Sequence, residues 1–119
     1  MAISEAFSGS ASISTTEYDL PSASTTLSAQ TTDGIYQLFL DLSALTSAEQ
    51  YTLRIYEKVT SSATQRVIEE VQIYGSLGTQ PNYVTPSMIF LHGWTYTLQR
   101  VASTGGTDKT ILWSIRQVA

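Results

Sequence analysis

Hydrophobic and polar residues alternate over several short segments of the chain, with a period of two residues. In the segment IYQLFLDL, residues 35–42, one face carries Tyr36, Leu38, Leu40 and Leu42. Because successive side chains of a β-strand point to opposite faces, this pattern predicts a strand with one buried side. Related patterns occur in YTLRIYEKV, RVIEEVQIY, SMIFLHGWTYTLQRV and TILWSIRQV. No segment shows the sustained period of an amphipathic helix, so the chain is predicted to be all-β.

Turn-forming segments such as GSLGTQPNYVTPS and ASTGGTDK separate the predicted strands. Seven or eight short strands with turns every 10 to 15 residues or so predict a single antiparallel β-sandwich, of the jelly-roll or immunoglobulin-like type. The segments 51–59 and 66–74, joined by a polar loop, predict an antiparallel hairpin. The chain has 119 residues, the usual size of one domain, and is long enough to bury a sizeable core.

The first 30 residues are the most polar part of the chain, and Pro21 within them does not fit a central strand. We predict that residues 1–20 form an N-terminal arm with short edge strands and that residues 21–119 form the sandwich domain. An arm that becomes ordered on a neighbouring protein needs hydrophobic anchors. The candidates are Ile3, Phe7, Ile13 and Tyr18. On this interpretation, removal of the arm leaves the sandwich folded.

The segment 35–42 also carries hydrophobic residues on its second face, where Ile35 and Phe39 alternate with Gln37 and Asp41. A strand with two apolar faces is either central and covered on both sides, or it presents one face as an interface. Ile35 and Phe39 are therefore candidate interface residues.

A carboxylate interrupts the apolar face of the segment YTLRIYEKV, because Glu57 is in phase with Leu53 and Ile55. The predicted hairpin brings Arg66 close to Glu57, and such an ion pair contributes less than about 1 kcal/mol when it is exposed. The alternative is a subunit boundary at which Glu57 meets a cation of another chain.

The composition narrows the range of functions. Charged residues make up 13% of the chain, against about 25% in average domains. The chain is instead rich in hydroxyl side chains, with 16 Ser and 17 Thr. The net charge of −4 argues against a nucleic-acid partner, because proteins that bind nucleic acids carry basic patches. The chain has no Cys, and it has no apolar run of the length that a membrane span requires, so we expect no disulfide and no membrane partner.

No segment carries a recognisable catalytic or metal-binding motif. Glu69 and Glu70 are adjacent on a predicted strand, so they point to opposite faces and cannot act as an acid/base pair. His92 is the only histidine and has no partner at metal-ligand spacing. We therefore expect no enzyme activity, no metal and no cofactor. Tyr83, in a loop with two prolines, is the best candidate for an exposed ring that stacks on a sugar.

Four segments, spread along nearly the whole chain, resemble a group of small proteins encoded by tailed phages, especially aquatic ones. Proteins of this group are short, lack Cys and are rich in Ser and Thr. SGSASISTTEYDL resembles a short arm that ends in a tyrosine strand, and TTDGIYQLFLDLSAL an apolar strand that ends in Asp and a turn. EQYTLRIYEKV resembles a strand that ends in a Tyr-Glu-Lys trio, and KTILWSIRQVA a final strand with a Trp, a basic residue and an apolar tail.

The resemblance implies a structural protein of the virion, most closely a head decoration or cement protein. Such a protein is expected to be a homotrimer on the outer capsid surface, where it binds the major capsid protein and stabilises the head. This role requires no cofactor, nucleic acid or membrane. Two alternatives stay open: a β-sandwich module that binds glycans or a receptor from a virion fibre or cell surface, and a neck or tail-completion protein.

Overall fold

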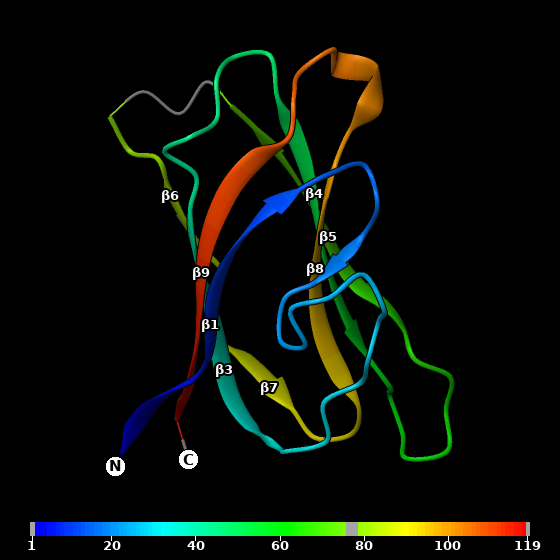
Figure 1. The fold of residues 1–119 in the computed structure, drawn as a ribbon. Coiled ribbons are helices and arrows are strands. Elements are labelled where there is room, and N and C mark those ends of the chain that lie inside the picture. The colour runs from blue at the N-terminus through cyan, green and yellow to red at the C-terminus, as the bar shows by residue number, and fades with distance from the viewer. Residues whose placement is uncertain (1, 76–78, 119) are drawn as a thin grey trace.

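The computed structural model describes residues 2–75 and 79–118 of the chain. In these residues nine strands form two antiparallel sheets that pack face to face (Figure 1). The all-β sandwich predicted from the alternation is confirmed. The strands are β1 (Ile3–Ile13), β2 (Tyr18–Asp19), β3 (Gly34–Asp41), β4 (Gln50–Glu57), β5 (Arg66–Tyr74), β6 (Asn82–Val84), β7 (Met88–Phe90), β8 (Trp94–Arg100) and β9 (Lys109–Val118), with a 3-10 helix η1 (Ala102–Thr104) after β8.

The first sheet has the strand order β1-β9-β3-β6, and β7 also pairs with β3. The two short strands share one edge of β3, because β7 pairs with its residues 34–36 and β6 with its residues 39–41. The second sheet has the order β2-β8-β4-β5. The hairpin predicted from segments 51–59 and 66–74 is the antiparallel pair of β4 and β5.

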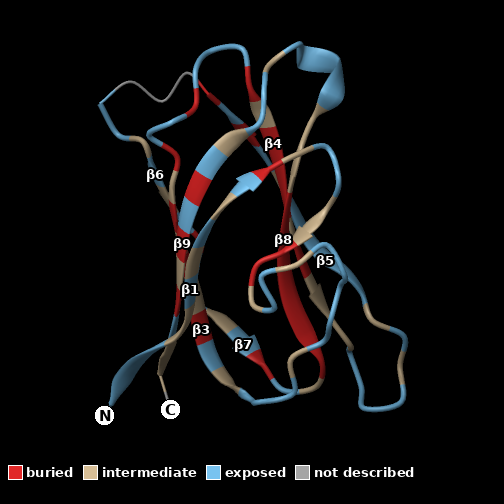
Figure 2. Cartoon of the chain, viewed as in Figure 1, coloured by how far each residue is buried: buried red, intermediate tan, exposed pale blue. Residues whose placement is uncertain are grey.

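The core lies between the two sheets and follows the predicted alternation (Figure 2). Tyr36 and Leu38 of β3 and Trp94 of β8 are almost completely buried. The Phe90 ring stacks on the Trp94 ring, with centroids 4.9 Å apart and an interplanar angle of 9°. Aromatic pairs of this kind add about 0.5–1.5 kcal/mol to the free energy gained from burial, so this stacked pair stabilises the core beyond the burial of its two rings.

The N-terminal segment differs from the predicted arm. Residues 3–13 form β1, which pairs with β9 along its whole length, and Ile13 is completely buried in the core. The Tyr18 ring packs edge-on against Trp113, with centroids 5.7 Å apart. Close packing here depends on a small residue, because a Cβ on Gly9 would lie 2.7 Å from Cζ2 of Trp113. The segment is therefore part of the sandwich, and removing it would also remove core residues.

Candidate functional site

The outer face of the first sheet carries a row of aliphatic side chains from four strands. Ile35 of β3 pairs with Val118 of β9 on one side and with Ile89 of β7 on the other, and Val118 also pairs with Ile3 of β1. Cross-strand partners point to the same face, so these side chains form a continuous row. Ile3, Ile35 and Ile89 expose 71%, 40% and 79% of their surface. Several exposed aliphatic residues side by side are typical of a contact surface.

Further apolar side chains extend this row along the sheet. Phe39 of β3 pairs with Val84 of β6, and Leu112 of β9 pairs with Asp41. Val84 and Leu112 are exposed and Phe39 is half-buried. Two shallow hollows lie on either side of Phe39. We call this surface the apolar face; it consists of Ile3, Ile35, Phe39, Val84, Ile89, Leu112 and Val118.

A cation lies within the apolar face. The guanidinium carbon of Arg116 is 3.7 Å from the centroid of the Phe39 ring, which is cation–π geometry. The Arg116 Nε donates a hydrogen bond to Ser114 Oγ at 3.2 Å, and Ser114 Oγ donates one to a Glu5 carboxylate oxygen at 2.5 Å. Arg116 also lines both hollows. The side chain is thus held against the sheet by a ring and by a hydroxyl.

The structure brings three of the predicted interface residues together on the apolar face: Ile3, Ile35 and Phe39. Ile13 is completely buried, so its proposed role as an anchor on a partner protein does not fit the structure. Phe7 and Tyr18 are half-buried and pack against the core of their own chain, because their positions on β1 and β2 face the second sheet or Trp113.

Glu57 has a local partner other than the predicted one. In the register of the hairpin Glu57 is opposite Arg66, but among the described residues no ion pair joins them. Instead, a Glu57 carboxylate oxygen accepts hydrogen bonds from the backbone N–H groups of Leu91 at 2.7 Å and His92 at 3.2 Å. The expected Glu57–Arg66 pair is therefore wrong. The carboxylate fixes the turn between β7 and β8, which presents the exposed Leu91 next to Ile89.

Tyr83 does not present an open ring. It pairs with Leu40, whose side chain faces the core, and its own side chain is half-buried and packs against the core. Burial raises the pKa of the Tyr83 hydroxyl, with a smaller contribution from the charge of Glu69. The structure thus removes the main candidate for a sugar-stacking ring, whereas Tyr74, at the end of β5, is the more exposed aromatic residue.

The second sheet is polar on its outer face around Glu17, although Val67, Ile68 and Tyr74 are exposed on its edge strand β5. Glu17 accepts hydrogen bonds from the hydroxyl of Tyr56 at 2.6 Å and from that of Thr97, and it lies 3.7 Å from a guanidinium nitrogen of Arg54. The Arg54 Nε also donates to Glu70 at 3.0 Å. Burial, and then the hydrogen bond to Glu17, raise the pKa of Tyr56 to about 12. These polar groups are satisfied within the chain, so this part of the second sheet differs in character from the apolar face.

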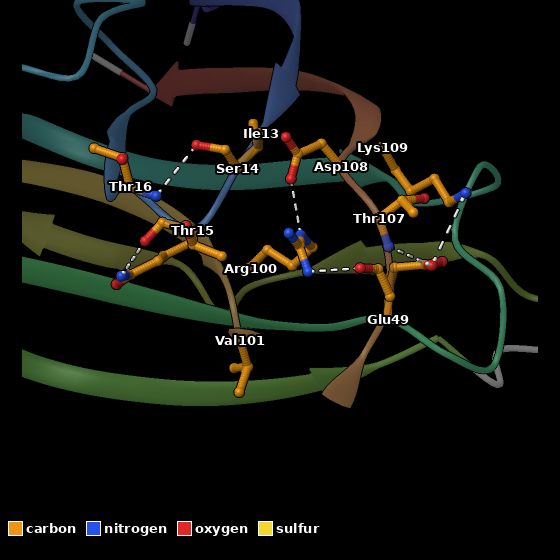
Figure 3. A network of polar contacts seen from close by, with 12 residues as sticks. Ile13, Ser14, Thr15, Thr16, Glu49, Arg100, Val101, Thr107, Asp108 and Lys109 are labelled. Atoms are coloured by element: carbon orange, nitrogen blue, oxygen red, sulfur yellow. Dashed lines mark hydrogen bonds and ion pairs between the residues drawn. The ribbon is translucent and has the colours of Figure 1, made fainter. Parts of the chain in front are cut away.

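A polar network closes one end of the sandwich, where the loop before β4 meets the loop between β8 and β9 (Figure 3). The buried Glu49 accepts hydrogen bonds from the Thr46 N–H at 2.6 Å and the Thr107 N–H at 3.2 Å, and it lies 3.9 Å from Lys109 Nζ. The Thr46 N–H contributes most to lowering the pKa of Glu49. All these donors belong to loops of the chain itself, so the network fixes the loops.

Sequence analysis missed Glu49, although the TSAE segment that contains it, residues 46–49, has the spacing of a capping box. One bond of that motif is formed, because Glu49 accepts from the Thr46 N–H, whereas Thr46 Oγ1 accepts from the N–H of Ala48 and not from that of Glu49. The chain turns there without continuing into a helix.

Within residues 2–75 and 79–118, no group of three or more His, Asp or Glu side chains is placed to hold a metal ion. In the same residues, no helix has the length and hydrophobicity to cross a membrane. In comparisons with family models, with curated proteins and with solved structures, nothing matches the chain.

Proposed function

We propose that this chain is a structural protein of a tailed-phage virion, a decoration protein that binds the major capsid protein on the outer surface of the head. In this role it acts without catalysis, as a homotrimer that bridges neighbouring capsid subunits and stabilises the lattice. The resemblance of four segments to small phage virion proteins supports this proposal, and so do the low charge and the abundance of Ser and Thr.

The observation that carries the proposal is the row of Ile3, Val118, Ile35 and Ile89 across four strands. A continuous apolar surface of this kind is costly to leave in water and marks a contact with another protein. The apolar face is broad and belongs to a sheet rather than to a flexible loop. It therefore suits a flat, rigid attachment to another folded surface.

Repetition strengthens such an attachment. If three copies are joined, binding of the first copy raises the effective concentration of the other two near their own sites. Modest contacts per copy then suffice for a stable coat.

The test is to fractionate the virions of the phage that encodes the chain and to measure its copy number relative to the major capsid protein. A ratio near one-to-one or one-to-three is the expected result. A dozen copies or fewer per particle would assign the chain to the neck or tail instead. Absence from the particles would refute a virion role and make a glycan- or receptor-binding module the next hypothesis to test.

A further inference from the structure

We infer that Arg116 is a docking anchor that receives a carboxylate from a partner protein, between apolar side chains of that partner. This inference rests on the proposed function, in which the apolar face is covered by another protein, and it specifies the chemistry of the contact. The expected occupant is an Asp or Glu side chain of the capsid protein with aliphatic neighbours.

The first argument is that Arg116 has hydrogen-bonding capacity to spare. None of the ion pairs formed by the described residues includes Arg116. Its Nε is bonded to Ser114 Oγ, while its two terminal nitrogens have no hydrogen-bond partner among residues 2–75 and 79–118. A guanidinium group that uses both terminal nitrogens can bind a carboxylate with two parallel hydrogen bonds.

The second argument is preorganisation. The Phe39 ring lies 3.7 Å below the guanidinium, and Ser114 Oγ, itself bonded to Glu5, accepts from the Nε. A free arginine loses considerable side-chain entropy when a partner immobilises it. Here the stacking on Phe39 and the hydrogen bond to Ser114 already restrict the Arg116 side chain, so less side-chain entropy is lost when the partner binds.

The third argument concerns the kind of anion. Arg116 lies between two shallow hollows, one lined by Ile3, Ile35 and Val118 and the other by Leu112. These hollows suit apolar side chains on either side of the carboxylate. A polyanion such as nucleic acid fits poorly, because the chain has a net charge of −4 and Glu5 is the cross-strand neighbour of Arg116. A protein carboxylate within an apolar patch is the complementary surface.

A test without capsids uses two peptides, acetyl-Leu-Asp-Leu-amide and the matched acetyl-Leu-Asn-Leu-amide, titrated into protein labelled for NMR. The Asp peptide should shift the Arg116 Nε–Hε and Phe39 ring signals in a saturable way at millimolar concentration, and the Asn peptide should not. The shift of the Phe39 ring signals should vanish in Arg116→Met, whereas both shifts should persist in Arg66→Met, which removes an exposed arginine from β5 on the other sheet. Equal shifts with both peptides, or no shift with either, would overturn the inference.

A second test measures binding of the chain to capsids assembled without it. Arg116→Met should weaken binding about tenfold or more, because the partner carboxylate would be left without its charged donor. Arg116→Lys, which keeps the charge but lacks the planar fork, should recover only part of the loss. The urea unfolding midpoints of both variants should equal that of the wild type, which separates docking from folding.

The two tests separate the inference from the proposed function. If the wild type does not bind capsids but distinguishes the two peptides, the proposed function fails and the anchor stands. If the wild type binds capsids and Arg116→Met binds equally well, the anchor fails and the proposed function stands. If the wild type self-associates and Arg116→Met is monomeric, the occupant is a second copy of the chain and the assignment to a capsid partner is overturned.

Discussion

Replacing Ile89 by Ala isolates the contribution of the apolar face to docking. The change removes three aliphatic carbons. If docking buried them completely, they would contribute about 2.4 kcal/mol to the binding free energy, at about 0.8 kcal/mol per carbon. Ile89 is 79% exposed in the free chain, so docking can bury about four-fifths of this surface, which corresponds to about 1.9 kcal/mol. The dissociation constant should therefore rise about 25-fold for each contacting copy.

The assay is a titration of purified chain onto capsids assembled without it, with bound and free protein separated by sedimentation. Ile68→Ala is the matched control, because Ile68 is an exposed isoleucine on β5 of the second sheet. It should bind like the wild type. Both variants should lose less than about 1 kcal/mol of unfolding free energy, since neither side chain lies in the core. If Ile89→Ala and Ile68→Ala bind alike, the apolar face is not the docking surface.

Three further predictions concern the fold. Ile13→Ala should lower the unfolding free energy by about 2–5 kcal/mol, because Ile13 is completely buried; a loss below about 1 kcal/mol in urea unfolding would contradict the assignment of β1 to the core. Glu57→Ala should speed hydrogen exchange at the Leu91 amide, which loses its acceptor, and unchanged exchange would show that Glu57 does not hold the turn. Glu49→Gln should lower the urea midpoint near neutral pH. The pKa of Glu49 is lowered from 4.5, so its stabilisation is present above that pH and disappears as the pH falls through the folded-state pKa; a wild-type-to-variant difference that stays constant in acid would refute this role.

The strands of the core could be predicted from the sequence because their burial follows a local period. Tyr36, Leu38 and Leu40 alternate with half-buried residues in the structure as they do in the pattern. The hairpin of β4 and β5 was predicted for the same reason, since its two strands are adjacent in the chain. Local sequence is less informative at Asp33-Gly34, a dipeptide typical of hairpin turns: the described residues 20–32 before it contain no strand, and Gly34 begins β3.

The N-terminal strand was predicted as an arm because its inner face is built from small residues. Gly9 and Ala11 face inwards between Phe7 and Ile13, while the alternate positions are Ser. The two faces of such a strand differ little in hydrophobicity, and its composition resembles that of a flexible segment. What makes it part of the core is the fit of Gly9 against the Trp113 ring, and this contact joins residues more than a hundred positions apart.

Part of the apolar face was accessible from the sequence. Ile35 and Phe39 lie on the second apolar side of one segment, so the pattern itself pointed to an interface. Ile89 and Val118 were missed, because their place beside Ile35 depends on which strands pair with β3. Glu57 is a similar case. The alternation places it on the inner face of its strand, but its hydrogen bonds are to a turn more than thirty residues away, which the local pattern does not reveal.

Hydroxyl-radical footprinting of the chain, free and on the virion, tests the central claim most directly. The oxidation rates of Ile3, Ile35 and Ile89 are measured in both states by mass spectrometry. The account predicts that all three are strongly protected on the particle, because the apolar face is covered there. Equal oxidation of these residues in the free and particle-bound chain would contradict it.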